Sequence, residues 1–129
     1  MPELPAGMLR RLYQKGSLRN TEDGFEFALL NTLAPGTVIG LGPIEVDGQM
    51  FPPEQITVVV GRSERAAHRV SAQGPLAFPV NGRILLRVTG EPLAPGRHTL
   101  VINAQLKEVG PLQIQVEDLL TVDDPADGY

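Results

Sequence analysis

The chain has 129 residues, of which 42% are hydrophobic and 20% are charged, and it contains no cysteine. This length and composition predict one globular domain with its own hydrophobic core, and they exclude disulfides, thiolate nucleophiles and cysteine-ligated metal sites. The formal net charge is −4 with acidic residues gathered near the C-terminus, so a continuous basic surface for nucleic acid is not expected. No segment approaches the ~20 apolar residues that cross a bilayer, and we expect a cytoplasmic protein without membrane contact.

Residues 1–14 form an N-terminal segment without strict alternation. Leu9, Leu12 and Tyr13 follow the i, i+3, i+4 spacing of a helix, and an edge strand is the alternative because the segment is short. We expect the sandwich domain to occupy residues 15–122. Residues 123–129 are expected to form an acidic flexible tail, because they combine turn-forming residues with no periodicity.

Apolar and polar residues alternate in five runs along the chain. In the first of them Phe25, Phe27 and Leu29 share one face, and the five runs are residues 24–31, 55–61, 82–90, 97–106 and 111–120. A period of two is typical of half-buried β-strands. The pattern predicts an all-β fold: a single antiparallel β-sandwich, immunoglobulin-like or jelly-roll-like, with seven to nine short strands and little helix.

Turn-forming residues separate these runs. The dipeptides Asp47-Gly48 and Asn81-Gly82 are typical of type I′ hairpins, in which both central residues need a positive φ. Gly40 and Gly42 predict a backbone bend or bulge. They do not predict a phosphate-binding loop, because Pro43 removes a backbone donor and a strand follows where a helix would be needed.

The sequence contains no pattern that points to a catalytic centre. His68 and His98 lie thirty residues apart without metal-ligand spacing, and no serine stands in a nucleophile elbow. The carboxylates on alternating strands are expected to point to solvent. We therefore predict no catalytic residue, no metal site and no cofactor, and whether the chain is an enzyme by itself stays open.

A basic stretch supplies the predicted ligand-binding residues. Residues 58–70, "VVVGRSERAAHRV", contain Arg62, Arg65, His68 and Arg69, which could bind an anion, an acidic partner surface, or a carbohydrate or similar ligand. The alternative is a solvated loop with no ligand.

Several strands also carry apolar residues on the face opposite the core. Leu30, Thr57, Val59 and Leu85 occupy such positions. An outer sheet face this apolar is expected to be covered by a partner, so these four residues are the predicted interface.

Three phrases resemble a known family: "KGSLRNTEDGFEFALLN" (15–31), "IEVDGQMFPPEQITVVVG" (44–61) and "LAPGRHTLVINAQL" (93–106). Together they resemble the small β subunits of bacterial C-deglycosylation enzymes. The resemblance implies a β-sandwich that binds a larger, metal-dependent barrel subunit, which carries the catalytic residues for cleaving C-glycosides.

Two functions are therefore expected. The first is a non-catalytic accessory subunit that assembles as a homo-oligomer or in a hetero-complex with a barrel-fold enzyme acting on glycosides. The alternative is a stand-alone domain that binds a small ligand or carbohydrate.

Overall fold

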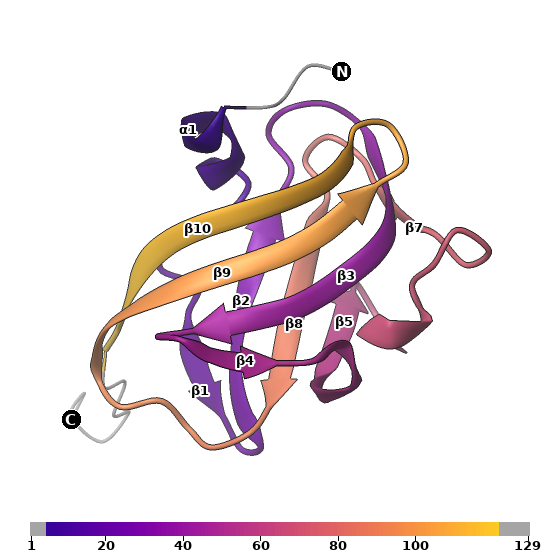
Figure 1. The fold of residues 1–129 in the computed structure, drawn as a ribbon. Coiled ribbons are helices and arrows are strands. Elements are labelled where there is room, and N and C mark those ends of the chain that lie inside the picture. Colours follow the sequence, from indigo (N-terminus) through magenta and orange to yellow (C-terminus); the bar gives the residue numbers. More distant parts are fainter. Residues whose placement is uncertain (1–4, 122–129) are drawn as a thin grey trace.

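Two antiparallel β-sheets packed face to face make up the protein (Figure 1). The structure is a computed structural model and describes residues 5–121. Its elements are α1 (Ala6–Arg10), β1 (Arg19–Thr21), β2 (Gly24–Leu30), β3 (Gly36–Val46), β4 (Gln49–Phe51), β5 (Ile56–Val60), β6 (Ser63–Ala66), β7 (Leu76–Phe78), β8 (Arg83–Thr89), β9 (Gly96–Leu106) and β10 (Gly110–Leu120), with short 3-10 turns η1 (Pro53–Gln55) and η2 (Ala67–Arg69).

The predicted all-β sandwich is confirmed. The described residues contain ten strands where seven to nine were expected. The difference arises because β1, β4 and β7 have three residues each, which is too short for alternation to be recognised.

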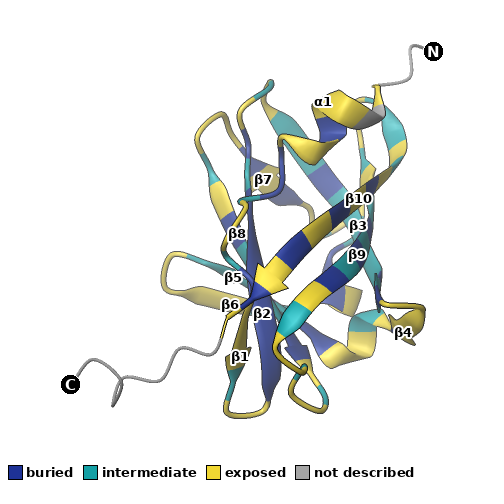
Figure 2. Cartoon of the chain, turned by 90° about the vertical axis from the view of Figure 1, so that its left-hand side faces the viewer, coloured by how far each residue is buried: buried dark blue, intermediate teal, exposed yellow. Residues whose placement is uncertain are grey.

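Sheet A has the strand order β1-β2-β8-β5-β6, and sheet B has the order β10-β9-β3-β4, with β7 also paired to β3. In sheet B, β9 and β10 pair without interruption from Gly110 opposite Leu106 to Leu120 opposite Gly96. Figure 2 shows buried and exposed residues alternating along β10, the period of a strand with one face on the core.

The core lies between the two sheets and consists of the inward-facing residues of the alternating runs. Its members with no measurable exposure include Phe25, Phe27, Ile44, Leu86, Val88, Leu100 and Ile102. Phe25 of sheet A meets Phe51 of sheet B edge to face, with ring centroids 5.4 Å apart. Such aromatic pairs add to the stability obtained from burying apolar area, so this contact helps to hold the sheets together.

The N-terminal segment closes one side of the sandwich by packing between the sheets. After α1 the chain runs along β2, where Leu30 N–H donates to the Leu12 carbonyl (2.7 Å) and Gln14 N–H donates to the Ala28 carbonyl (2.9 Å). The helix itself packs against β10. The segment therefore contains both a short helix and a short edge pairing.

No helix within residues 5–121 is long and apolar enough to cross a membrane.

The two predicted hairpin turns have different outcomes. Asp47 (φ 51°) and Gly48 (φ 90°) both adopt positive φ between β3 and β4, as a type I′ turn requires. The hairpin predicted at Asn81-Gly82 is wrong, because β7 pairs with β3 of sheet B and β8 belongs to sheet A. The turn is instead a crossover between sheets, and a Cβ on Gly82 would lie 2.8 Å from the Pro79 carbonyl oxygen.

The bulge predicted in the glycine-rich part of β3 is confirmed. The register of β3 against β9 shifts between Val38 and Gly40 and again between Leu41 and Ile44, and Gly42 has a φ of 102°. These irregularities let one long strand pair with β9 along its length and with β7 and β4 at its two ends.

Candidate functional site

The predicted ligand-binding residues are spread over three elements. Arg62 precedes β6, Arg65 lies on β6, and His68 and Arg69 lie on η2. The guanidinium of Arg65 donates to the carbonyls of Gly74 (2.8 Å) and Pro75 (3.4 Å), so it holds the loop before β7. Within residues 5–121 no hydrogen bond or ion pair joins two of the four side chains. Binding of a ligand by them stays a prediction.

The predicted interface residues lie on the outer face of sheet A. Val59 on β5 stands directly opposite Leu85 on β8, Thr57 is opposite Arg87, and Leu30 on β2 is opposite Arg83. All four predicted residues are half-buried in the isolated chain. We call Leu30, Thr57, Val59 and Leu85 the apolar face.

A row of charged side chains borders the apolar face. Glu26 on β2 lies between Arg19, whose Nε is 2.5 Å from Oε2, and Arg87, whose Nε is 3.4 Å from Oε1. Arg87 also reaches Glu64 on β6 at 3.8 Å. The row runs across sheet A from β1 to β6, so the apolar face has a polar rim.

Glu26 differs from the expected solvated carboxylate. Its side chain points away from the core, as the alternation predicts, but it is only 2% exposed. Two arginines contact its carboxylate, and their hydrogen bonds and opposite charge replace the contacts with water that burial removes.

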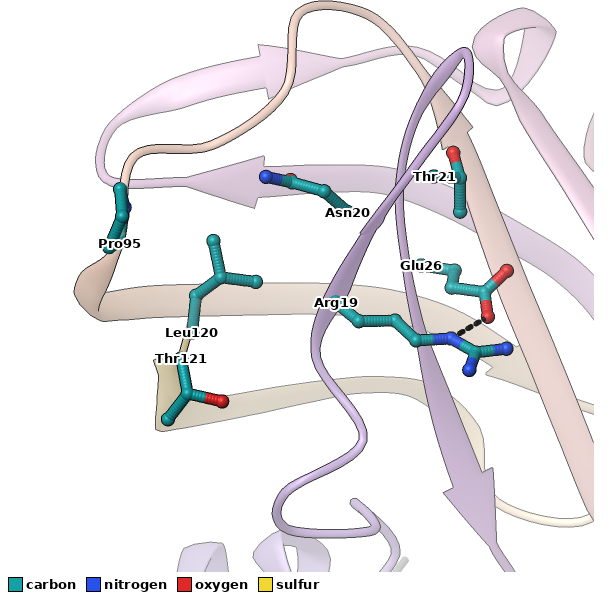
Figure 3. A pocket seen from close by; sticks show the side chains of 7 residues that line it. All are labelled: Arg19, Asn20, Thr21, Glu26, Pro95, Leu120 and Thr121. Atoms are coloured by element: carbon teal, nitrogen blue, oxygen red, sulfur yellow. Dashed lines mark hydrogen bonds and ion pairs between the residues drawn. The ribbon is translucent and has the colours of Figure 1, made fainter. Parts of the chain in front are cut away.

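A polar hollow of about 610 Å³ lies beside this pair, lined by Arg19, Asn20, Thr21, Glu26, Pro95, Leu120 and Thr121. Figure 3 shows the Arg19 guanidinium against the Glu26 carboxylate on one side and Pro95, Leu120 and Thr121 on the other. The side-chain amide of Asn20 is hydrogen-bonded to the backbone of Leu93: Nδ2 donates to the Leu93 carbonyl, and Oδ1 accepts from the Leu93 N–H, both at 2.9 Å. The Asn20 amide and the Arg19–Glu26 pair therefore stabilise the fold, whereas Thr21 Oγ1 is buried without a hydrogen-bond partner among the described residues.

His98 at the start of β9 is 8% exposed, and both of its ring nitrogens are hydrogen-bonded. Nδ1 lies 2.5 Å from Asp47 Oδ2, and Nε2 lies 2.6 Å from the Ala94 carbonyl oxygen. Both neighbours accept hydrogen bonds, so the site favours the protonated imidazole, which donates from both nitrogens. This cation connects the β3–β4 turn to the loop before β9.

The environment shifts the pKa of both partners. Burial lowers the pKa of His98, but the Ala94 carbonyl and the Asp47 carboxylate outweigh burial and raise it above its ordinary value of 6.5. The Thr99 N–H, which donates to Asp47 at 2.8 Å, and then His98 hold the pKa of Asp47 below its ordinary value of 3.8. The pair is therefore fully charged at mildly acidic pH.

This pair predicts how stability depends on pH. The folded-state pKa of His98 is raised, so its contribution is complete below pH 6.5 and is lost as the pH rises through the higher folded value. We expect the free energy of unfolding, measured by urea denaturation, to fall as the pH rises above 6.5, and His98→Gln to remove this decline. His68→Gln, at an exposed histidine, should keep it, and equal slopes in both variants would contradict the assignment.

Asp118 on β10 is a buried carboxylate, 4% exposed, that binds the N-terminal segment. It accepts hydrogen bonds from the Tyr13 phenol (2.6 Å) and from the backbone N–H groups of Gly16 (3.0 Å) and Leu18 (3.3 Å). Burial and the bond to Asp118 raise the pKa of Tyr13 far above its ordinary value of 10, so the phenol stays protonated and donates. Asp118 is opposite His98 in the β9–β10 pairing, but its oxygens are occupied by these donors.

Within residues 5–121 no group of three or more histidine and carboxylate side chains could hold a metal ion.

Residues 8–121 match the family described as hydroxymethylglutaryl-CoA reductase, N-terminal domain. The chain belongs to this family. The match extends from within α1 to the residue after β10, so it covers the whole sandwich. A comparison with curated proteins finds no match.

Membership in the hydroxymethylglutaryl-CoA reductase N-terminal-domain family overturns the resemblance to C-deglycosylation β subunits, which is wrong. The phrases that carry the resemblance encode backbone geometry. Asp47-Gly48 closes a hairpin, and Gly96, with a φ of 124°, begins β9. Such turns recur in unrelated sandwiches, and the barrel-enzyme partner loses the evidence on which it depended.

Sequence reasoning missed two polar clusters in this member of the reductase N-terminal-domain family, those around His98 and Asp118. The sequence did indicate that Asp118 is buried, because Ile114, Val116 and Asp118 lie at alternate positions of β10, and these positions face the core. A carboxyl group on the core-facing side of an alternating strand predicts a buried, hydrogen-bonded polar group. No comparable signal identified the Asp47–His98 pair, whose members are 51 residues apart.

Proposed function

We propose that the chain is a non-catalytic interaction module of a hydroxymethylglutaryl-CoA reductase assembly, and that its apolar face docks on the catalytic part of that enzyme. The observation that carries this proposal is the directly opposed pair Val59 and Leu85 on the outer side of sheet A. Family membership supports the choice of partner.

The difference between the two outer sheet faces supports docking through sheet A. On sheet B the outward residues of β10 are the polar Gln113, Gln115 and Glu117 and the apolar Leu119 at the end of the strand, and all four are exposed. The outward residues of the central strands of sheet A include leucine and valine. Apolar side chains at the centre of a sheet face favour coverage by a partner, whereas a polar face is stable in water.

The border of the apolar face has the character of an interface rim. Arg87 and Glu64 are partly exposed beside it and form a long ion pair of 3.8 Å. Protein interfaces commonly combine an apolar centre with a polar, solvent-accessible rim, and arginine is enriched there. Charges at the rim chiefly affect specificity and the rate of association.

Binding to the purified catalytic part of the reductase from the same organism tests the proposal. Isothermal titration should detect association, and Leu85→Glu should weaken it about tenfold or more, because a carboxylate would be buried without a partner. Gln115→Glu makes the same change of size and charge on the outer face of sheet B and should bind within about twofold of the wild type.

Three outcomes contradict the proposal. The wild type fails to bind the catalytic part, both variants lose binding equally, or light scattering shows a dimer of the chain alone that Leu85→Glu dissociates. The last result would assign the apolar face to self-association.

A further inference from the structure

A second feature, independent of the apolar face, is a cavity of about 380 Å³ between the two sheets at the end closed by α1. Its lining is almost entirely apolar and includes Met8, Leu12, Leu33, Ala104, Leu106 and Leu112. These residues come from α1, the segment that follows it, the β2–β3 connection and the β9–β10 hairpin. The cavity lies among side chains that elsewhere form a closely packed core.

The polar groups that border the cavity already have partners within the chain. The Asn31 amide donates to the carbonyls of Ala34 and Phe78, both at 2.8 Å, and its oxygen accepts from Leu33 N–H at 3.0 Å. A polar head group inside the cavity would find few free donors or acceptors, and burying it there would be unfavourable.

Glu108 is the charged residue among the described residues that line the cavity. Its carboxylate accepts hydrogen bonds from Thr37 Oγ1 (2.8 Å) and Thr37 N–H (2.9 Å). These bonds lower its pKa, so it is negative at neutral pH. A negative group at the border disfavours a ligand that carries its own carboxylate.

From the volume, the apolar lining and the paired polar groups, we infer that this cavity binds an uncharged hydrocarbon molecule of medium length. An apolar protein cavity of about 150 Å³ is enough for benzene, and this one is more than twice as large. Small-molecule pockets usually begin at about 300 Å³ and are lined mainly by apolar side chains. Met8 at the border adds a flexible side chain that can adapt to different shapes.

Fluorescence of the uncharged dye phenylnaphthylamine, which brightens in an apolar environment, tests the inference on the full chain. The wild type should bind the dye saturably, and decanol should displace it at least about tenfold more effectively than decanoate. Ala104→Phe fills the cavity and should weaken dye binding about tenfold or more. The control Gln115→Phe, on the outer face of sheet B, and Leu85→Glu, on the apolar face, should each bind within about twofold of the wild type.

Absence of saturable dye binding by the wild type would overturn the inference, as would unchanged binding by a folded Ala104→Phe variant. Equal displacement of the dye by decanoate and decanol would overturn the inference that the ligand is uncharged. If Ala104→Phe fails to fold, Leu33→Trp fills the cavity from the more tolerant β2–β3 connection, and the same loss of binding is required of it. Leu85→Glu changes the apolar face and leaves the cavity intact. The dye-binding result is therefore independent of whether the proposed docking occurs.

Discussion

Replacing Asp118 by alanine is expected to lower the free energy of unfolding by about 3 kcal/mol, because buried donors that lose their acceptor each cost on the order of 1–3 kcal/mol. The Tyr13 phenol and the N–H groups of Gly16 and Leu18 would lose their partner together. Removal of a buried polar group offsets part of this loss. Urea denaturation at neutral pH, extrapolated to water, measures the difference.

Two further variants separate the carboxylate from its neighbourhood. Asp118→Asn keeps one carbonyl acceptor, so it should lower the free energy of unfolding by less than Asp118→Ala does. Glu117→Ala, one residue away in an exposed 3.4 Å pair with Arg97, should change stability by less than about 0.5 kcal/mol. A change below about 0.5 kcal/mol for Asp118→Ala would contradict the role assigned to this residue.

The Asp118→Ala variant should also have a local effect. Amide hydrogen exchange within residues 13–18 should speed up more than exchange in the core strands, because Asp118 attaches this segment to sheet B. Exchange that rises equally throughout the chain would instead indicate a global loss of stability.

Gly24→Ala is expected to destabilise the protein by about 3 kcal/mol or more, since overpacking against rigid backbone cannot be relieved by a rotamer change. Gly24 begins β2 and is buried opposite Thr89. A Cβ there would press against the Val88 carbonyl oxygen, closer than real Cβ atoms approach, and would lie 2.9 Å from the Gly90 nitrogen. The β2–β8 pairing at the centre of sheet A would have to shift.

Gly36→Ala is the matched control, because Gly36 also begins a strand. The nearest atom to its added Cβ would be Leu106 Cδ1 at 3.6 Å, an ordinary van der Waals contact with a flexible side chain. Its free energy of unfolding, measured by urea denaturation, should stay within about 1 kcal/mol of the wild type. Equal losses for the two variants would contradict the steric explanation of Gly24.

The fold class could be predicted because alternation is a property of each strand by itself. Residues 111–120 alternate in the sequence, and β10 alternates in burial over that range. The outward placement of Val59 and Leu85 follows from the same parity, and the register places them opposite each other. What covers them could not be predicted, because alternation contains no information about a partner.

The family prediction failed for a related reason. Turn phrases such as residues 46–49 report local backbone geometry, which many sandwiches share, whereas family membership depends on the pattern of the whole chain over residues 8–121. The Asn81-Gly82 prediction failed because the dipeptide favours a turn but does not determine which sheets the flanking strands join.

The sequence by itself determined that this is an all-β domain, which residues face its core, and that several residues on the outer side of the central strands, such as Val59 and Leu85, are apolar. Only the tertiary structure decided that Glu26 is buried by two arginines, that His98 is held as a cation by Asp47, and that an apolar cavity opens beside α1. The physical reason is range. Alternation arises between neighbouring residues, whereas ion pairs, hydrogen-bonded clusters and cavities depend on the strand order that brings distant segments together.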